Sequence, residues 1–222
     1  MISAIDLWKF VHILLFVYWL GADLGVFLLA LTARRAELTF DQRAIALRMA
    51  MVIDVTPRLC FALMFPVGLE LAAAMGAVEP TAATRLLAWL VSAVWVAIVL
   101  GMVRLEGKPL GHALTKANAT LHAVLLVVVV GIGLASVLGH GPFPQGWLGW
   151  KVLLFGLIFF CGLMIDREFK PMLPAFGRLA TEGSKPDIEH DITRAVNGAI
   201  RWVLALYALV LIIAFLGTAR PF

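Results

Sequence analysis

Six long runs of hydrophobic residues, separated by shorter polar stretches, dominate the pattern of this chain. About 20 apolar residues, each adding about 1.5 Å of helix, suffice to cross the hydrocarbon core of a bilayer. The pattern therefore predicts an all-α, polytopic membrane helix bundle of about six transmembrane helices, folded as a single integral membrane domain over residues 1–222. The expected spans are residues 6–31, 49–76, 85–103, 118–138, 147–165 and 195–217.

The composition supports the membrane class. Hydrophobic residues make up 62% of the 222 residues and charged residues only 14%, whereas a soluble domain is about half apolar and a quarter charged. The net charge of +4 does not indicate nucleic-acid binding, because the basic residues lie mostly between the apolar runs. Cys60 and Cys161 lie in separate runs without the spacing of a metal motif, and we expect them to fill the core.

The basic residues also predict an orientation. Most of the 18 Lys and Arg residues lie in the first, third and fifth loops. The positive-inside rule places these loops in the cytoplasm and both termini on the non-cytoplasmic side. We expect the bacterial inner membrane. The first run is too long for a signal peptide and should remain in the mature protein. The polar stretch 166–193 is expected to form a short amphipathic helix or a partner contact.

The first run carries ionisable groups where they are costly. Lys9, His12 and Asp23 lie in or near the hydrocarbon, and such groups are functional candidates by default. On a helical wheel His12, Trp19 and Asp23 share one face. An imidazole beside aromatic rings in a membrane helix favours a planar cofactor, so we predict haem, with His12 on the iron and Trp19 beside it. The alternative is a histidine hydrogen-bonded to a neighbouring helix.

Topology places further candidates at similar depth. Lys151, Glu70 and His140 are expected in the same half of the bundle as His12. Lys151 and Glu70 are candidate catalytic residues. For Lys151 there are two interpretations: it pairs with haem propionates or with a substrate carboxylate, or it extends its ammonium to the membrane interface. His122 and His140 lie five helical turns apart, about 27 Å, on one face. They are candidate cofactor ligands at two separate sites, or histidines of the two interfaces.

A second charged group is expected nearer the other surface. Asp23 and Arg58 lie at similar depth in the first and second runs, and an ion pair makes both tolerable there. Asp54 lies one turn before Arg58 and is expected to share it. The structural interpretation is an ion pair that locks two helices, and the alternative is a proton path or an anion site.

Short motifs in two runs resemble a known family of membrane proteins. The first helix of HemJ-type protoporphyrinogen oxidases and related CopD-like proteins opens with Trp, Lys and His, followed by Trp and Gly. This chain has Trp8, Lys9, His12, Trp19 and Gly21, and its Trp147 and Lys151 resemble the family's Trp-x-x-x-Lys helix. The resemblance implies a haem ligand at His12 and a role for Lys151 beside cofactor or substrate. The third and fourth spans look like an addition to a smaller core.

These observations lead to three functional hypotheses. The first is a haem b protein that transfers electrons or oxidises a small or membrane-borne donor, with porphyrinogen oxidation as a specific form; it leaves open whether the chain is an enzyme. The second is CopD-like copper handling, and the third a structural or assembly subunit. Expected partners are the bilayer, a redox protein or quinone and a second copy of the chain. The soft ligands that copper(I) favours are Met49, Met51, Met64 and Cys60.

Overall fold

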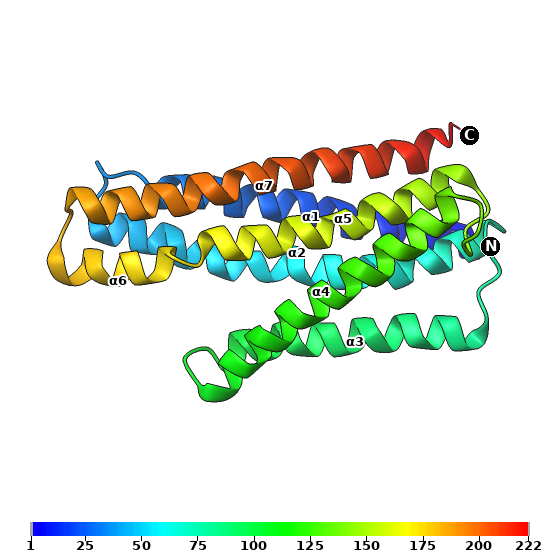
Figure 1. The fold of residues 1–222 in the computed structure, drawn as a ribbon, viewed down its shortest axis with the longest axis horizontal. Helices are drawn as coiled ribbons and strands as arrows, with labels where there is room; N and C mark the ends of the chain where they lie inside the picture. Colours follow the sequence, from blue (N-terminus) through cyan, green and yellow to red (C-terminus); the bar gives the residue numbers. More distant parts are fainter. Residues whose placement is uncertain (1, 222) are drawn as a thin grey trace.

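The computed structural model describes residues 2–221, and over this range the chain is all-helical, without a strand (Figure 1). Six helices are long and apolar enough to cross a membrane, counting α5 and α6 as one. The expected all-α class with six apolar helices is confirmed. The helices are α1 (Ala4–Ala33), α2 (Phe40–Ala74), α3 (Ala82–Arg104), α4 (Pro109–Val137), α5 (Gly146–Phe169), α6 (Met172–Glu182) and α7 (Pro186–Ala219).

Local sequence sets where the first two helices begin. Ser3 and Asp6 form a capping box at the start of α1, and Thr39 and Gln42 form another at the start of α2. In each box the hydroxyl accepts a hydrogen bond from a backbone N–H that the helix leaves free. These caps fix two helix starts to the residue, which hydrophobicity alone does not do.

Several helices run past the expected spans. α2 begins at Phe40 instead of residue 49, and α7 begins at Pro186 instead of residue 195. Apolarity marks only the part of a helix that suits a bilayer, and α2 with its 35 residues is about 52 Å long against a core of about 30 Å. The stretch 166–193 contains α6, whose Phe176 and Leu179 are buried, together with the first turns of α7.

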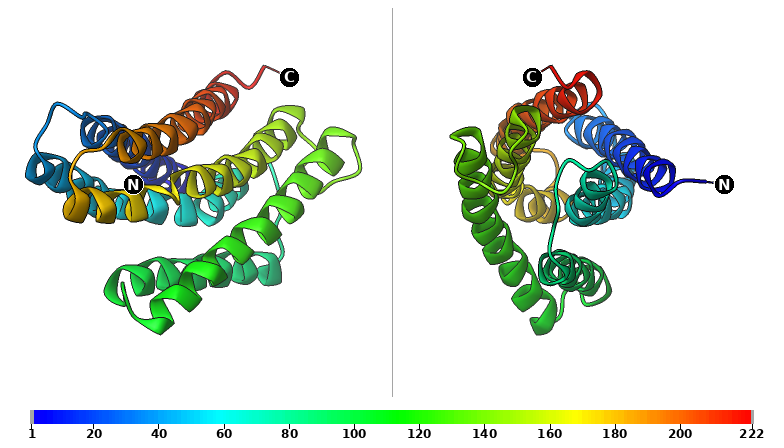
Figure 2. Two further views of the ribbon diagram at one scale, coloured as in Figure 1. Left: turned by 60° about the vertical axis from the view of Figure 1, so that its left-hand side comes forward. Right: turned by 90° about the vertical axis from the view of Figure 1, so that its right-hand side faces the viewer.

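Two pairs of helices frame the interior. α1 packs on α2, and α5 packs on α7, whereas α1 and α7 touch only at a few positions. α3 and α4 lie on one flank, with α4 crossing α5 obliquely (Figures 1 and 2). Both chain ends lie at one end of the bundle and α6 lies at the other (Figure 1). The cavities described below are lined mainly by residues of these four helices.

A second core closes the end of the bundle that contains α6. It is built by the end of α1, the start of α2, α6 and the start of α7. Arg43, whose side chain is 1% exposed, lies in it and donates hydrogen bonds to Glu189 at 2.7 and 2.9 Å and to the Ala33 carbonyl at 2.9 Å. Its guanidinium also lies 5.6 Å from the centre of the Phe176 ring. We call these four residues the Arg43 clamp; it joins α1, α2, α6 and α7.

Candidate functional site

A cavity of 520 Å³ lies in the bundle near the chain ends. It is lined from α1, α2, α5, α7 and the turn before α5, and we call it the His12 cavity. Its volume falls within the range of about 300–1,000 Å³ typical of ligand sites. Its polar lining residues are Lys9, His12, Lys151, Thr218 and Arg220, and apolar or glycine residues form the remainder.

His12 presents an unsatisfied imidazole to this cavity. Its Nδ1 atom is buried and has no hydrogen-bond partner among the described residues. Gly68 of α2 lies against the ring, and a Cβ there would come within 3.4 Å of His12 Cε1. A buried polar atom without a partner costs about 1–3 kcal/mol, which a ligand at the ring can offset. The expected alternative, a hydrogen bond from His12 to a neighbouring helix, is therefore not formed through Nδ1.

The charges that line the His12 cavity are all positive. Lys9, Lys151 and Arg220 contribute three cations, and no Asp or Glu is among the lining residues. Lys151 forms no ion pair within residues 2–221. Its Nζ atom lies over Gly217, where a Cβ would be only 2.5 Å away, and 5.9 Å from the centre of the Trp147 ring. The cavity is thus suited to an apolar ligand that carries negative charges at one side.

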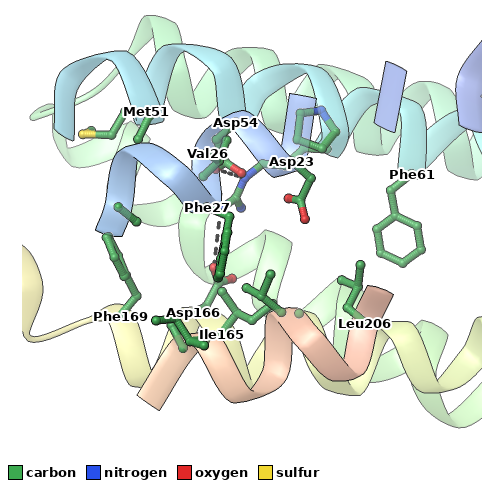
Figure 3. Close-up of a pocket in the computed structure, with 18 of the residues that line it drawn as sticks. Asp23, Val26, Phe27, Met51, Asp54, Phe61, Ile165, Asp166, Phe169 and Leu206 are labelled. Atoms are coloured by element: carbon green, nitrogen blue, oxygen red, sulfur yellow. Dashed lines mark hydrogen bonds and ion pairs between the residues drawn. The ribbon is translucent and has the colours of Figure 1, made fainter. Parts of the chain in front are cut away.

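The second cavity, of 190 Å³, lies further along the bundle and is shown in Figure 3. We call it the His122 cavity. His122 is 6% exposed, and its buried Nδ1 has no hydrogen-bond partner among the described residues. The carboxyl of Asp23 points into the space between α1 and α7 (Figure 3). The charged lining residues are Asp23, Asp54, Arg58 and Asp166.

Arg58 is held by Asp54, as expected, and by Asp166 in place of Asp23. Its Nε donates to Asp54 at 2.5 Å and its Nη2 to Asp166 of α5 at 3.5 Å. The predicted ion pair between Arg58 and Asp54 is present, but Arg58 forms no ion pair with Asp23 within residues 2–221. Asp54 takes precedence because residues four apart lie over one another on a helix. The ion pair locks α2 to α5, whereas the sequence predicted a lock between α1 and α2.

Trp19 separates the two cavities. It is 5% exposed and lines both of them, as does Ile158. Its ring lies 4.9 Å from that of Phe61, which lies 4.9 Å from that of Trp95, and Trp95 lies 5.0 Å from the imidazole of His122. An aromatic chain therefore runs from the wall of the His12 cavity to His122.

Glu70 and His140 do not line either cavity. Glu70 accepts hydrogen bonds from Arg85 at 2.7 Å and from the Trp89 indole at 3.4 Å, so its carboxylate ties α2 to α3. His140 is exposed in the turn after α4. Depth along a helix placed both beside His12, but depth does not determine the direction in which a side chain points.

The sulfur ligands considered for copper all lie on α2. Cys60 and Met64 are buried one turn apart, whereas Met49 and Met51 lie nearer the start of the helix, and Met49 is 51% exposed. Within residues 2–221, no group of three or more His, Cys, Asp or Glu side chains is arranged to hold a metal ion. The structure brings His12, Trp19 and Lys151 together at the His12 cavity.

Two residues of these sites were not expected from the sequence. Arg220 follows the last helix and lines the His12 cavity, and Asp166 ends the fifth apolar run and holds Arg58. Both are charges at the margin of an apolar run, where a solvated side chain is the ordinary expectation.

Comparisons of the chain with protein-family models, with curated proteins and with solved structures found no match.

Proposed function

We propose that this chain is a haem b-binding protein of the bacterial inner membrane that transfers electrons or oxidises a small or membrane-borne donor. In this proposal both termini face away from the cytoplasm, and the His12 cavity lies in the outer half of the bilayer. The first, third and fifth loops support that orientation, because they hold most of the Lys and Arg residues and positive charge accumulates on the cytoplasmic side.

The observation that carries the proposal is the combination of His12 with three cations, and no Asp or Glu among the described lining residues, in one apolar cavity. Haem is a flat apolar macrocycle with two carboxylates, and imidazole is a common ligand of its iron. A cavity of 520 Å³ lined by Phe16, Phe65 and Trp147 suits the macrocycle, and Lys151 and Arg220 suit the carboxylates. The buried Nδ1 of His12, which has no hydrogen-bond partner among the described residues, supports a ligand-binding role for this imidazole.

Haem, when bound, supplies one-electron redox chemistry, and the residues of the chain position and tune it. His12 of α1 would supply an imidazole to the iron. Lys151 and Arg220 would pair with the carboxylates of the haem, and their positive charge would favour its reduced form. Trp19 closes the cavity toward the interior of the bundle and keeps water from it. A porphyrinogen carries carboxylates on a similar tetrapyrrole ring, although its saturated bridges make that ring puckered, and its oxidation is the specific form of this proposal.

A pair of absorption spectra tests the proposal. We expect purified protein, oxidised and then reduced with dithionite, to show a Soret band and a reduced α-band. His12→Ala should lose most of this absorbance, because it removes the axial imidazole. His140→Ala is the matched control, since His140 is exposed and lies outside both cavities, and it should keep the wild-type spectrum.

Two results would contradict the haem proposal. One is a colourless protein that cannot be reconstituted with haem. The other is metal analysis that finds copper without haem, which would favour the copper-handling hypothesis. If His12→Ala binds haem with an unchanged spectrum, the assignment of His12 as ligand is wrong even though haem is present.

A further inference from the structure

The His122 cavity has features of a ligand site that the haem proposal does not use. We propose that it binds the headgroup of a membrane quinone. The inference concerns a different cavity from the haem site and does not depend on that site. It rests on the buried imidazole, on the size and lining of the cavity, and on the sign of its charges.

The imidazole of His122 is the first argument. His122 is only 6% exposed, and its Nδ1 has no hydrogen-bond partner among the described residues. Gly162 of α5 lies beside it, and a Cβ there would be 3.7 Å from Nδ1, so no side chain of α5 covers the ring at that point. A neutral imidazole both donates and accepts a hydrogen bond, as recognition of a quinone carbonyl and a quinol hydroxyl requires.

The size of the cavity is the second argument. Its 190 Å³ is well under half of the 520 Å³ of the His12 cavity. The smaller cavity therefore suits a single substituted six-membered ring and not a second tetrapyrrole. Trp19, Phe27 and Phe61 line it and offer flat apolar surfaces to a ring. Met51, one of the lining residues, is 39% exposed, so part of the wall of the cavity lies at the protein surface.

The charges are the third argument, because they select the kind of ligand. Three carboxylates line the cavity, and one guanidinium, that of Arg58, is already paired with two of them. An anionic ligand would be repelled, in contrast to the His12 cavity. The remaining carboxyl, that of Asp23, forms no ion pair within residues 2–221 and points inward (Figure 3). A neutral ligand that gives up and takes up protons suits Asp23 and His122 together.

Equilibrium binding of two matched ligands tests the inference. Purified protein in detergent is titrated with decylubiquinone and, separately, with decylbenzene, which has the same tail but no oxygens. We expect wild-type protein to bind decylubiquinone more tightly. His122→Phe should weaken the binding of decylubiquinone about tenfold by removing a buried hydrogen bond, and should leave the affinity for decylbenzene unchanged. His140→Phe is the matched control and should bind both ligands as wild type does.

Gly162→Leu provides an independent variant, because it places a side chain over the imidazole from α5 without changing His122. It should lose decylubiquinone binding and decides the question if His122→Phe does not fold. Equal binding of both ligands by wild type, or decylubiquinone binding unaffected by Gly162→Leu, would overturn the inference. Haem spectra of the same samples separate the two proposals. Haem without quinone binding refutes only the quinone site, and quinone binding without haem refutes only the haem site.

Discussion

Removal of the carboxylate of Glu189 is expected to destabilise the protein strongly. Arg43 is 1% exposed and makes two hydrogen bonds to Glu189, at 2.7 and 2.9 Å. Glu189→Ala leaves a buried guanidinium with only the Ala33 carbonyl as partner. Breaking one side of a buried pair costs about 3–5 kcal/mol. At about 2–4 °C per kcal/mol for a chain of this size, Tm should fall by about 6–20 °C in thermal unfolding followed by circular dichroism.

Two further variants make this experiment decisive. Arg43→Met combined with Glu189→Met removes both charges and should recover most of the lost Tm, because an apolar pair of similar volume is often no less stable. Glu37→Ala removes the carboxylate from the exposed pair with Arg35 and should leave Tm unchanged. A Glu189→Ala protein that unfolds within 2 °C of wild type, on the order of the error of such scans, would refute the account of the Arg43 clamp.

Two further predictions concern glycines at close contacts. Gly133→Ala should lower stability by about 1–3 kcal/mol, because its Cβ would lie 2.4 Å from the backbone nitrogen of Leu153. Gly131→Ala, two residues away with no atom within 4 Å, should not destabilise in the same thermal scan. Gly217→Val should displace the Lys151 ammonium and weaken haem binding in a titration, because a Cβ at this position would lie 2.5 Å from Lys151 Nζ. Gly131→Ala is again the control. An unchanged affinity for haem would exclude Lys151 from the haem site.

The class of fold could be predicted from the sequence because the apolar runs are long and well separated. Apolarity indicates which segments suit a bilayer, but it does not indicate where a helix ends once it has left the bilayer. For this reason the first turns of α2 and α7 were expected to lie in loops. The burial of Arg43 was also not predictable, because its partner Glu189 lies 146 residues away and only the tertiary fold brings them together.

The candidate site was predictable only in part, for a related reason. Depth along a helix correctly grouped His12 with Lys151, since both line one cavity, but it also grouped Glu70 and His140, which point elsewhere. Asp23 and Arg58 lie at similar depth and line one cavity, yet Arg58 pairs with nearer carboxylates. Depth is one coordinate, and a contact also requires that two helix faces be turned toward each other.

The position of the Arg43 clamp has a consequence for how ligands reach the interior. The clamp joins α1, α2, α6 and α7 at one end of the bundle, whereas α1 and α7 touch little along their length. The His12 cavity lies toward the opposite end, between residues such as Lys9 and Arg220 near the chain ends. We therefore expect any separation of α1 from α7 to widen that cavity and to leave the clamp in place. Of the two ends of the bundle, the His12 cavity lies at the one that the clamp does not hold.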